Sequence, residues 1–438
     1  MTTKIITSPK EAAELLLSGG LVAFATETVY GLGAVMQNEQ AVKNIFLAKG
    51  RPNDNPLILH IPTFNDILPL INPTDKQLEL LKKLYSAFCP APLTFILPKS
   101  DLVPKYITGG RETVAVRVPK NDLTLEFLKL VGEPVPAPSA NISGTPSPTK
   151  AEHVYNDLNG KIDAILDGGQ CEAGLESTIV DLTVSPAQIL RHGAITIEMI
   201  RELIPDIGIY KGEEIAKAPG MKYRHYAPKA ELIKLAPEQK PEAGEDIVCI
   251  SRNKYEGVTN LFSGYTDSEF AHNLYNLFRK ADELNAKKIY IETPDSETGI
   301  AKGIITRINK AIESSSEVII VSRKREDISK FVKDKIMGKV LLAKMGSEIV
   351  GVLEYLENDL EIEVLNIIVR EDKRKRGIGK ELINALPNKK RLLEVRESNK
   401  IAQEFYKKLG FIENGQREKY YDNKEDAKLM EKENINNG

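Results

Sequence analysis

Apolar and polar positions alternate along this chain in blocks that predict helices and strands in turn. A Ser-Pro pair at residues 8–9 is typical of a helix N-terminus, and two glycines at residues 19–20 would end that helix. The apolar segment LVAFAT (residues 21–26) predicts a buried strand, and TVAVRVP (residues 113–119) alternates as a strand with two distinct faces does. The first 205 residues therefore predict an α/β sheet domain.

The pattern changes twice after residue 205. The segment APGMKYRHYAP has no periodicity and predicts an interdomain linker. Short apolar strands then alternate with amphipathic helices, which implies a small parallel sheet. We expect its strands at residues 247–250, 288–291 and 318–321 and its helices at residues 269–284 and 300–312. A third α/β region begins near Lys324, with three strands, a basic turn and two helices.

Length and composition set the class of protein. A chain of 438 residues with 42% hydrophobic and 28% charged residues is expected to fold as two or three globular domains. The net charge of −2 excludes neither nucleotides nor RNA as ligands. The three cysteines lack metal-ligand spacing and are typical of reduced thiols. Without an apolar run of membrane-spanning length or a signal-peptide core, we expect a cytoplasmic protein.

Several cations stand at positions where a ligand phosphate could be bound. Lys49 and Arg51 flank a predicted helix end at a Gly/Pro corner, although a solvated helix terminus would have the same pattern. Arg117 interrupts one face of an apolar strand, and Arg191 does the same on another strand. A buried arginine needs an anionic partner, which could be a ligand or an internal carboxylate. Both alternatives remain open from the residues alone.

Three polar segments add hydroxyl groups to this set. PVPAPSANISGTPSPT (residues 134–149) joins rigid prolines to small hydrogen-bonding side chains, as in the wall of a polar ligand site, although a proline-rich linker would look similar. TETVYGLG (residues 26–33) follows a strand, where α/β folds place ligands, and GLEST (residues 174–178) enters another strand. Together they predict a cavity without a nucleophile–base pair, which would act by positioning and charge neutralisation.

These motifs resemble the YrdC-like family, the L-threonylcarbamoyl-AMP synthases. The matching segments are TETVYGLG, KGRPNDNPL, TVAVRVP, PSANISGTPSPT, GLESTIVDL and ILRHGAI, in family order. The resemblance implies a YrdC-like twisted open sheet with a ligand cavity over residues 1–205, and a linker over residues 206–229. It also implies the small α/β domain of the long-form synthase at residues 230–322. The family makes threonylcarbamoyl-AMP and pyrophosphate from L-threonine, bicarbonate (as CO2) and ATP, and the product serves tRNA modification.

The resemblance also implies roles for individual residues. ATP, entering as its Mg²⁺ complex, would be held by Lys49, Arg51, Asn55, Thr113, Ser139, Asn141, Ser147, Arg191 and the linker residues Tyr223, His225 or Tyr226. Threonine would be bound by Thr28, His60, Arg117, Ala137 and Ser177. Lys49 and Arg51 would carry the catalytic charge stabilisation. We further expect residues 211–228 to fold over the cavity as a lid that excludes water, although a packed spacer is the plain alternative.

A second group of motifs lies near the C-terminus. LNIIVREDKRKRGIGKELINAL (residues 365–386) predicts a strand, a basic turn and a helix whose N-terminal amides could bind pyrophosphate. LLEVRESNKIAQEFYKKLGF follows at residues 392–411. This region resembles the GNAT acetyltransferases, most closely the RimI type that acetylates protein N-termini, and implies a GNAT-like α/β domain at residues 323–438. The helices that usually shape the acceptor pocket are mostly missing, which leaves the acceptor open.

By this second resemblance, Glu394 would be the base that deprotonates the amine and Tyr406 the acid for the leaving thiolate. Acetyl-CoA would be bound by Ile367, Ile368, Val369, Arg374, Lys375, Arg376, Gly377, Ile378, Gly379 and Asn399. A degenerate module retained for packing is the alternative.

The chain as a whole is thus predicted to be a synthase joined to an acetyltransferase. A transferase complex of the tRNA-modification machinery would accept the synthase product. The alternative from another class is a double-stranded RNA-binding or regulatory protein with a degenerate acyl-CoA module. It would need an extended Lys/Arg face, whereas the basic residues here lie among small hydroxyl residues. A third possibility is an acyltransferase whose N-terminal half only senses nucleotide.

Overall fold

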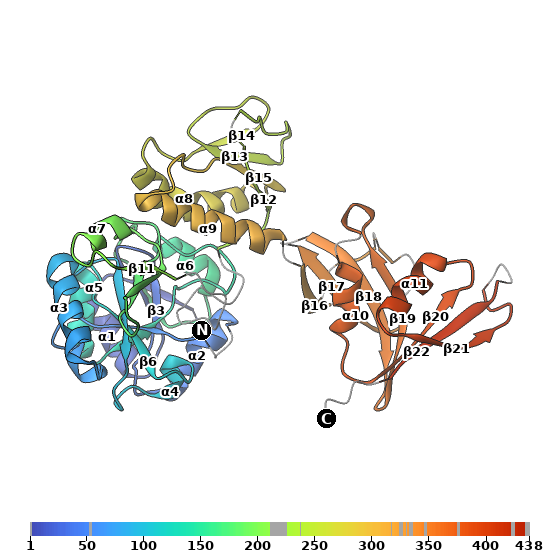
Figure 1. The fold of residues 1–438 in the computed structure, drawn as a ribbon, viewed down its shortest axis with the longest axis horizontal. Helices are drawn as coiled ribbons and strands as arrows, with labels where there is room; N and C mark the ends of the chain where they lie inside the picture. The colour runs from blue at the N-terminus through green and yellow to red at the C-terminus, as the bar shows by residue number, and fades with distance from the viewer. Residues whose placement is uncertain are drawn as a thin grey trace. The chain divides into compact units, whose positions relative to one another are not determined.

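The computed structural model describes residues 2–51, 55–210, 226–236, 238–316, 318–323, 327–329, 331–332, 336–345, 348–374, 377–421 and 425–433. The chain divides into two compact units, Met1–Ser315 and Ser316–Gly438. Unit 1 contains the blue to orange part of the ribbon in Figure 1 and unit 2 the orange to red part.

The first part of unit 1 contains two sheets. One has the strand order β1-β8-β2-β3, and the other has the order β11-β10-β9-β5-β6-β4-β7. The first sheet comprises β1 (Lys4–Ile6), β2 (Val22–Phe24), β3 (Gly31–Gly33) and β8 (Ala164–Leu166). The second comprises β4 (Ile58–His60), β5 (Leu93–Pro98), β6 (Thr113–Arg117), β7 (Val135–Ala137), β9 (Thr178–Asp181), β10 (Gln188–Arg191) and β11 (Gly208–Ile209). The helices of this part are α1 (Pro9–Leu17), α2 (Glu39–Lys49), η1 (Leu68–Leu70), α3 (Asp75–Phe88), α4 (Lys105–Thr108), α5 (Asp122–Val131), α6 (Ala151–Leu158) and α7 (Ile197–Arg201).

Local signals explain where these helices begin and end. The Ser8 hydroxyl accepts a hydrogen bond from the Glu11 backbone N–H at 3.3 Å, with proline as the first helical residue of α1, as predicted. The N-cap Asn38 starts α2, and Gly50 ends it in the left-handed region at φ 60°. The chain therefore turns sharply after Lys49, which is the corner that the sequence predicts.

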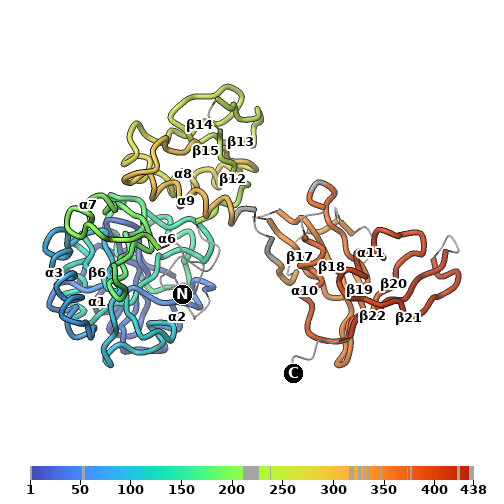
Figure 2. Tube along the Cα trace, viewed as in Figure 1, coloured from blue at the N-terminus to red at the C-terminus, as the bar shows by residue number. Residues whose placement is uncertain are grey.

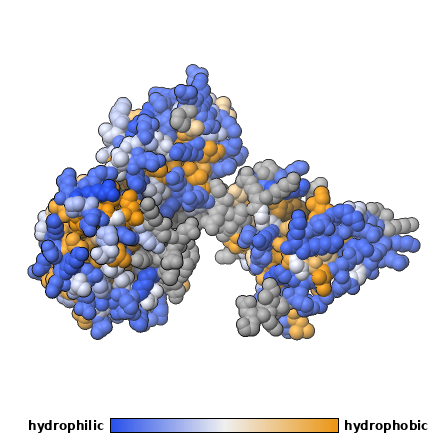
Figure 3. All heavy atoms as spheres, viewed as in Figure 1, coloured by the Kyte–Doolittle hydropathy of each residue, from blue (hydrophilic) through white to orange (hydrophobic). Residues whose placement is uncertain are grey.

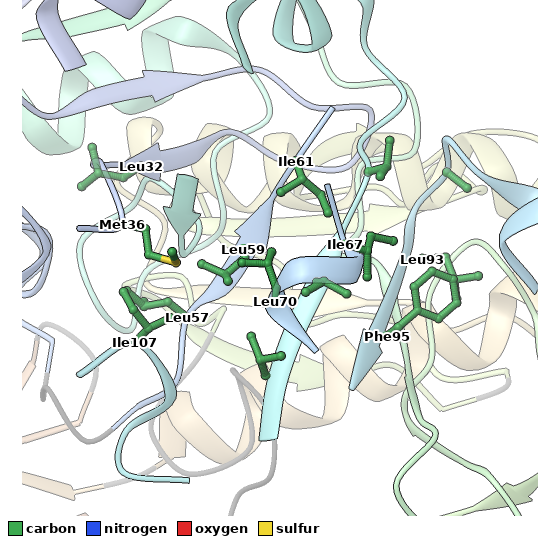
Figure 4. Packing of buried hydrophobic residues seen from close by; sticks show 14 of the residues in the cluster. Leu32, Met36, Leu57, Leu59, Ile61, Ile67, Leu70, Leu93, Phe95 and Ile107 are labelled. Carbon is green, nitrogen blue, oxygen red and sulfur yellow. The ribbon is translucent and has the colours of Figure 1, made fainter. Parts of the chain in front are cut away.

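The largest core cluster lies in this first part of unit 1. Figure 4 shows side chains from β4 and its flanks, from Leu70 and from β5 gathered into one apolar layer. Leu59, Leu70, Leu93 and Phe95 are each no more than 3% exposed. This packing holds β4 beside its parallel neighbour β6. In that pair, His60 of β4 lies opposite Arg117 of β6. His60 and Arg117 therefore lie at the same end of two neighbouring strands, which the apolar core holds in place.

The second part of unit 1 is the small parallel sheet that the alternating pattern predicts. Its four strands have the order β12-β15-β13-β14, and every pairing is parallel. The elements are β12 (Glu231–Lys234), β13 (Ile247–Ser251), β14 (Thr259–Phe262), α8 (Asp267–Glu283), β15 (Lys288–Ile291) and α9 (Gly299–Ser316).

Helices α8 and α9 join this small sheet to the first part of the unit (Figure 1). Their buried faces, with Leu274 and Ile304, belong to one apolar cluster with residues of β13 and β15. Val29 and Leu175 of the first part belong to the same cluster. The junction therefore contains an apolar cluster, and the two parts of unit 1 pack as one body.

One predicted strand pairs elsewhere. The strand expected at residues 318–321 forms, but it pairs antiparallel with Lys339–Met345 in unit 2, so its predicted place in the small parallel sheet is wrong. Helix α9 runs to Ser316, directly before this strand. An apolar strand of five residues carries no signal of its own for a partner, because period and composition are the same in either sheet.

Unit 2 is built on one seven-stranded sheet with the order β16-β17-β18-β19-β20-β22-β21, whose course Figure 2 follows along the Cα trace. Its strands are β16 (Val318–Ser322), β17 (Lys339–Met345), β18 (Glu348–Glu357), β19 (Glu361–Val369), β20 (Lys390–Arg396), β21 (Ile412–Arg417) and β22 (Ala427–Lys432). Its helices are η2 (Glu371–Lys373), α10 (Ile378–Asn384) and α11 (Lys400–Lys408). Most neighbouring strands are antiparallel, but β19 and β20 are parallel.

Hydrophilic residues cover most of the face seen in Figure 3, and hydrophobic residues form smaller groups between them. Within the described part of the chain, no helix is both long and apolar enough to cross a membrane.

Candidate active site

One cavity of unit 1 collects most of the cations and hydroxyl groups that the motifs predict. It measures about 680 Å³ when the space that opens to solvent is included. Its walls come from the loop after β2, the end of α2, the strands β4 and β6, and the segment after β7. The predicted residues that line it are Thr28, Lys49, Arg51, His60, Arg117, Ala137, Ser139, Asn141, Arg191 and Tyr226.

Lys49 is the most deeply held cation of this cavity. Its side chain is 2% exposed, and Nζ donates to the backbone oxygens of Ser139 and Asn141, each at 2.5 Å. The Ser143 N–H in turn donates to the Lys49 carbonyl at 2.8 Å. Burial, followed by the charge of Arg51, lowers the pKa of Lys49 well below its ordinary value. The end of α2 and the proline-rich segment are therefore fastened to each other around one amine.

Arg117 has an internal carboxylate as its partner and also lines the cavity. Its Nη2 lies 2.8 Å from Glu27 Oε2, and both side chains are 4% exposed. The contact is an ion pair outside hydrogen-bonding geometry: neither Arg117 Nε nor either Glu27 oxygen has a hydrogen-bond partner among the described residues. Arg117 also lines the cavity, so its guanidinium is compensated by an internal carboxylate while it faces the ligand space.

His60 lies beside Arg117 and stays neutral. Its Nδ1 is 3.1 Å from the Ile58 carbonyl, which can only accept, so Nδ1 carries the proton in this contact. Burial and then the charge of Arg117 lower the pKa of His60 to about 3. The imidazole is therefore neutral at neutral pH and adds no charge to the cavity.

Arg191 enters the cavity from β10 and is held by the GLEST segment. Its Nε donates to the Ser177 carbonyl at 2.9 Å, and Nη2 lies 3.1 Å from Ser177 Oγ. Ser177 Oγ is also 2.7 Å from Thr94 Oγ1. Ser177 does not line the cavity but stands behind Arg191 and orients it. Arg51, Arg117 and Arg191 thus converge on one cavity instead of being scattered.

The comparisons with known proteins agree over the whole of this unit. A family model described as telomere recombination, for Sua5, YciO and YrdC proteins, matches residues 14–193. The model for the threonylcarbamoyl-AMP synthase C-terminal domain matches residues 195–312. The threonylcarbamoyl-AMP synthase of Pyrococcus abyssi is 44% identical over 318 residues, which cover 68% of this chain and 92% of the relative. This chain belongs to the threonylcarbamoyl-AMP synthase family.

Further relatives of this synthase family support the assignment. The threonylcarbamoyl-AMP synthase of Bacillus subtilis is 40% identical over 324 residues, covering 69% of this chain and 92% of the relative. Among solved structures, the crystal structure of P. abyssi Sua5 complexed with L-threonine matches with a TM-score of 0.66 and 40% identity. That match covers 71% of this chain and 98% of the P. abyssi chain.

The remaining predicted residues of the synthase site lie apart from the lining. Ser147 is 1% exposed, and its hydroxyl donates to Glu176 Oε1 at 2.7 Å. Asn55 is 2% exposed and precedes β4, and Thr113 begins β6; neither lines the cavity. Tyr223, His225 and residues 211–225 of the expected lid lie outside the described residues. The roles predicted for all of these residues stay predictions.

Sequence reasoning missed two acidic residues at the synthase site. Glu176 lines the cavity, and Glu27 pairs with Arg117 from behind it. Both lie within motifs that the sequence singled out, GLEST and TETVYGLG. The sequence does contain a signal for both residues: each is a carboxylate among small residues next to a buried strand, where a charged side chain needs a partner.

In unit 2, the parallel strands β19 and β20 separate where the second set of motifs predicts a site. Their pairing ends at Val364 and Leu393, although β19 continues to Val369 and β20 to Arg396. Residues 367–369 and Glu394 therefore stand on the two strands beyond the last pair. Beyond this pair, the facing backbone groups of the two strands are not bonded to each other.

The predicted chemical groups of unit 2 have distinct surroundings. Glu394 Oε1 lies 2.9 Å from Arg417 Nη1. Tyr406 is 6% exposed, and burial raises its pKa to about 12. Asn399 caps α11, with its side-chain oxygen accepting from the Ala402 N–H at 3.1 Å, so that oxygen already has a structural role.

The basic turn of unit 2 is described in part. Arg374 Nε donates to the Val369 carbonyl at 3.1 Å, and Gly377 precedes α10 with φ 81°. A side chain at Gly379 would meet the Phe405 ring at 3.0 Å, so a glycine lets α10 approach α11 closely. Lys375 and Arg376 lie outside the described residues. A GNAT acetyltransferase family model matches residues 337–413, which shows that unit 2 contains a GNAT domain.

Proposed function

We propose that unit 1 joins L-threonine, bicarbonate (as CO2) and ATP into threonylcarbamoyl-AMP and pyrophosphate, for the threonylcarbamoyladenosine modification of tRNA. The observation that carries the proposal is the convergence of Lys49, Arg51, Arg117 and Arg191 on one cavity in a chain of this synthase family. A transferase complex that modifies tRNA would accept the product. The comparisons give no support to the alternative of an RNA-binding regulatory protein.

The cavity offers separate positions for the two substrates. Arg117 and His60 lie side by side on parallel strands, where the guanidinium would bind the threonine carboxylate and the neutral imidazole a hydroxyl or ammonium group. Lys49, Arg51 and Arg191 would face the phosphates of ATP. The P. abyssi relative that was crystallised with L-threonine supports an amino acid site in this fold.

No protein base is needed for the proposed chemistry. The threonine amine adds to CO2 and loses a proton to give a carbamate, whose oxygen attacks the α-phosphate in line while pyrophosphate leaves. Negative charge grows on the pyrophosphate, and the guanidinium and ammonium groups would stabilise it in place. A mixed anhydride of this kind hydrolyses readily, so we also propose that the segment 206–229, of which Tyr226 lines the cavity, excludes water.

Mg²⁺ would enter as part of the ATP substrate. The described residues contain no group of three or more His, Cys, Asp or Glu side chains that could hold a metal ion. Glu176, the acidic residue that lines the cavity among those described, already accepts hydrogen bonds from Ser147, Tyr275 and Arg307. The fit of the donor set therefore favours a metal bound by phosphates over one bound by side chains.

Pyrophosphate release by the full-length protein tests the synthase proposal. We expect release from Mg·ATP to require both L-threonine and bicarbonate, with threonylcarbamoyl-AMP detected by mass spectrometry. Arg117→Met should raise the threonine KM by about tenfold or more, because a charge-assisted hydrogen bond contributes about 1.5–3 kcal/mol. Release of pyrophosphate that does not depend on threonine would contradict the proposal.

We also propose that unit 2 transfers the acetyl group of acetyl-CoA to a primary amine, with a protein N-terminus as the acceptor. The end of the pairing between β19 and β20 at Val364 favours this function, because Glu394 follows directly on the last residue of β20 in that pairing. Glu394 would take the proton of the amine, and Tyr406, kept protonated by its raised pKa, would donate to the departing thiolate. Acetylation of N-terminal peptides, assayed by release of the CoA thiol, tests the proposal; no release with any peptide would contradict it.

A further inference from the structure

Glu176 is a buried carboxylate that three different segments of unit 1 bind at once. It is 6% exposed and lines the synthase cavity. Ser147 donates to its Oε1 at 2.7 Å from the proline-rich segment. From α8, the Tyr275 hydroxyl lies 3.0 Å from Oε1 and 2.9 Å from Oε2. From α9, Arg307 Nε donates to Oε2 at 3.1 Å. Two of these three partners therefore come from the small parallel-sheet part of the unit.

Arg307 is among the most deeply buried charged side chains of the described residues, at 1% exposure. Besides the Glu176 carboxylate it binds backbone, with Nη2 donating to the Glu176 carbonyl at 3.3 Å and Nη1 to the His192 carbonyl. Glu176 and His192 lie next to Ser177 and Arg191, which shape the cavity. A buried guanidinium is stable only with such a full set of acceptors. Arg307 therefore links two cavity segments, the GLEST segment with Glu176 and the end of β10 followed by His192, to α9.

A second contact leads from the same helices to the cavity. The rings of Tyr226 and Tyr275 stack with centroids 5.5 Å apart and an interplanar angle of 27°. Tyr226 lines the cavity, and its hydroxyl is hydrogen-bonded to the side chain of Arg191. Tyr275 thus contacts Glu176 with its hydroxyl and supports Tyr226 with its ring. The side chains of α8 and α9 thus contact Glu176 and Tyr226 directly, and they reach Arg191 through Tyr226.

The charges around Glu176 explain what this arrangement does. Burial would raise the pKa of Glu176, but the guanidinium groups of Arg307 and Arg191 and the Ser147 hydroxyl hold it below its ordinary value. The charges of both guanidinium groups thus act on this one carboxylate, and Arg307 also forms an ion pair with it. While Arg307 is bonded to Glu176, the charge of Arg191 is less compensated by this carboxylate and can act on a ligand. Without Arg307, Glu176 would keep its hydrogen bonds from Ser147 and Tyr275, but Arg191 would be the guanidinium left to compensate its charge, and the carboxylate would compete with a ligand for it.

We propose that Arg307 and Tyr275, residues of the small parallel-sheet part, are positioning residues of the synthase cavity: by holding Glu176 they keep Arg191 and Tyr226 directed at the phosphates of ATP. This rests on the proposed function of unit 1 and adds to it. The small sheet then contributes to nucleotide affinity through α8 and α9, without touching the ligand.

The test measures ATP affinity by titration calorimetry, together with KM, kcat and unfolding temperature, on the full-length chain. Arg307→Gln should weaken ATP binding by about tenfold or more, Tyr275→Phe by about three- to tenfold, and Arg307→Lys should be intermediate because it keeps the charge and loses the fork. Effects on the ATP KM should exceed those on the threonine KM.

Arg279→Gln is the matched control. Arg279 also extends from α8 across the junction, where it pairs with Asp157 at 2.8 Å, with both side chains about nine-tenths buried, and donates to the Pro146 carbonyl at 2.5 Å. It thus contacts the proline-rich segment, as Glu176 does, but no hydrogen bond or ion pair joins it to Glu176. We expect it to lower the unfolding temperature and to leave ATP affinity within about twofold, because buried ion pairs matter for stability wherever they lie.

Two outcomes would contradict the proposal, and a third would contradict the proposed function of unit 1 alone. Equal ATP affinity in wild type, Arg307→Gln and Tyr275→Phe would overturn it, and so would equal weakening in Arg279→Gln. If Arg307→Gln does not fold, the isosteric Tyr275→Phe decides alone. If wild type binds ATP but releases no pyrophosphate with threonine, the proposed function fails, while the binding comparison still tests these positioning residues.

Discussion

Arg117 and Glu27 form a buried ion pair, 2.8 Å apart, at the wall of the synthase cavity. The pair is incomplete as a hydrogen-bonded unit, because Arg117 Nε and both Glu27 oxygens have no hydrogen-bond partner among the described residues. A buried ion pair normally needs such bonds to offset the loss of hydration. The incomplete shell fits a position that a substrate carboxylate completes.

Glu27→Gln removes the internal carboxylate partner of Arg117 and so tests whether a ligand carboxylate binds the same guanidinium. Removing one member of a buried pair destabilises a protein by about 3–5 kcal/mol, since the other charge stays buried and uncompensated. L-threonine should then raise the unfolding temperature of Glu27→Gln by more than it raises that of wild type, because its carboxylate replaces Glu27 as the partner of Arg117. Differential scanning fluorimetry with and without L-threonine measures both effects.

Glu112→Gln is the control for this substitution. Glu112 is 74% exposed and lies 4.0 Å from Lys99 and 3.7 Å from Lys105, and exposed pairs contribute only about 0–1 kcal/mol. Its unfolding temperature and its response to threonine should match those of wild type. An equal threonine shift in Glu27→Gln and wild type would show that Arg117 does not bind the substrate carboxylate.

Protons should be taken up when ATP binds. Burial and the charge of Arg51 lower the pKa of Lys49 well below its ordinary value. A triphosphate favours the ammonium form and so raises this pKa, and a proton is bound at any pH between the two values. Calorimetric titrations of ATP in buffers with different ionisation enthalpies measure the number of protons.

Lys49→Met should abolish this uptake and Lys43→Met should retain it. Lys43 lies on the same helix but is exposed, pairs with Glu39 at 2.8 Å and does not line the cavity. Proton uptake that persists in Lys49→Met would assign the effect to another group.

The cations of the synthase cavity could be predicted because each follows a local signal. Lys49 and Arg51 stand on either side of the left-handed glycine that ends α2, a helix that begins at an Asn cap. Arg117 interrupts a strictly alternating strand. Caps and alternation depend on neighbours in sequence, so one chain is enough to read them. The family resemblance then placed these residues in one site.

The contact between Glu176 and Arg307 could not be predicted in this way. The two residues are 131 positions apart, and α9 shows only an amphipathic pattern that many partners would satisfy. The same limit applies to β16, whose apolar residues suit a parallel and an antiparallel neighbour equally. Which carboxylate meets which guanidinium is decided by the packing of whole elements, after local structure has formed.

Gly174 tests how closely the two parts of unit 1 must approach. A side chain there would lie 2.4 Å from the Ala271 carbonyl oxygen and 2.5 Å from His272 Cα, both backbone atoms of α8. Gly174→Ala should push α8 away from the GLEST segment, with a loss of about 1–3 kcal/mol from overpacking beyond the backbone strain. Synthase activity should fall with it, because Glu176 lies two residues further on.

Gly169→Ala is a closely matched control. Both glycines have a left-handed φ, 70° for Gly174 and 79° for Gly169, but nothing lies within 4 Å of a side chain at Gly169. That variant should lose only about 1–2 kcal/mol, the cost of a left-handed alanine, and keep its activity. Equal losses of stability in the two variants, measured by denaturant unfolding, would refute the close contact.

Tyr406→Phe tests the proton donor of unit 2. Loss of a general acid lowers a rate by about 10²–10⁴-fold, whereas the affinity for acetyl-CoA should stay nearly constant because the proton moves only in the transition state. With a pKa of about 12, Tyr406 in wild type should not cause a fall in rate between pH 7 and pH 9 through its own ionisation, since it keeps its proton over that range.

Tyr355→Phe, at a buried tyrosine of the same core cluster, should transfer acetyl groups at the wild-type rate. Release of the CoA thiol with a panel of N-terminal peptides measures the rates, and equal rates in the two variants would show that Tyr406 has only a packing role.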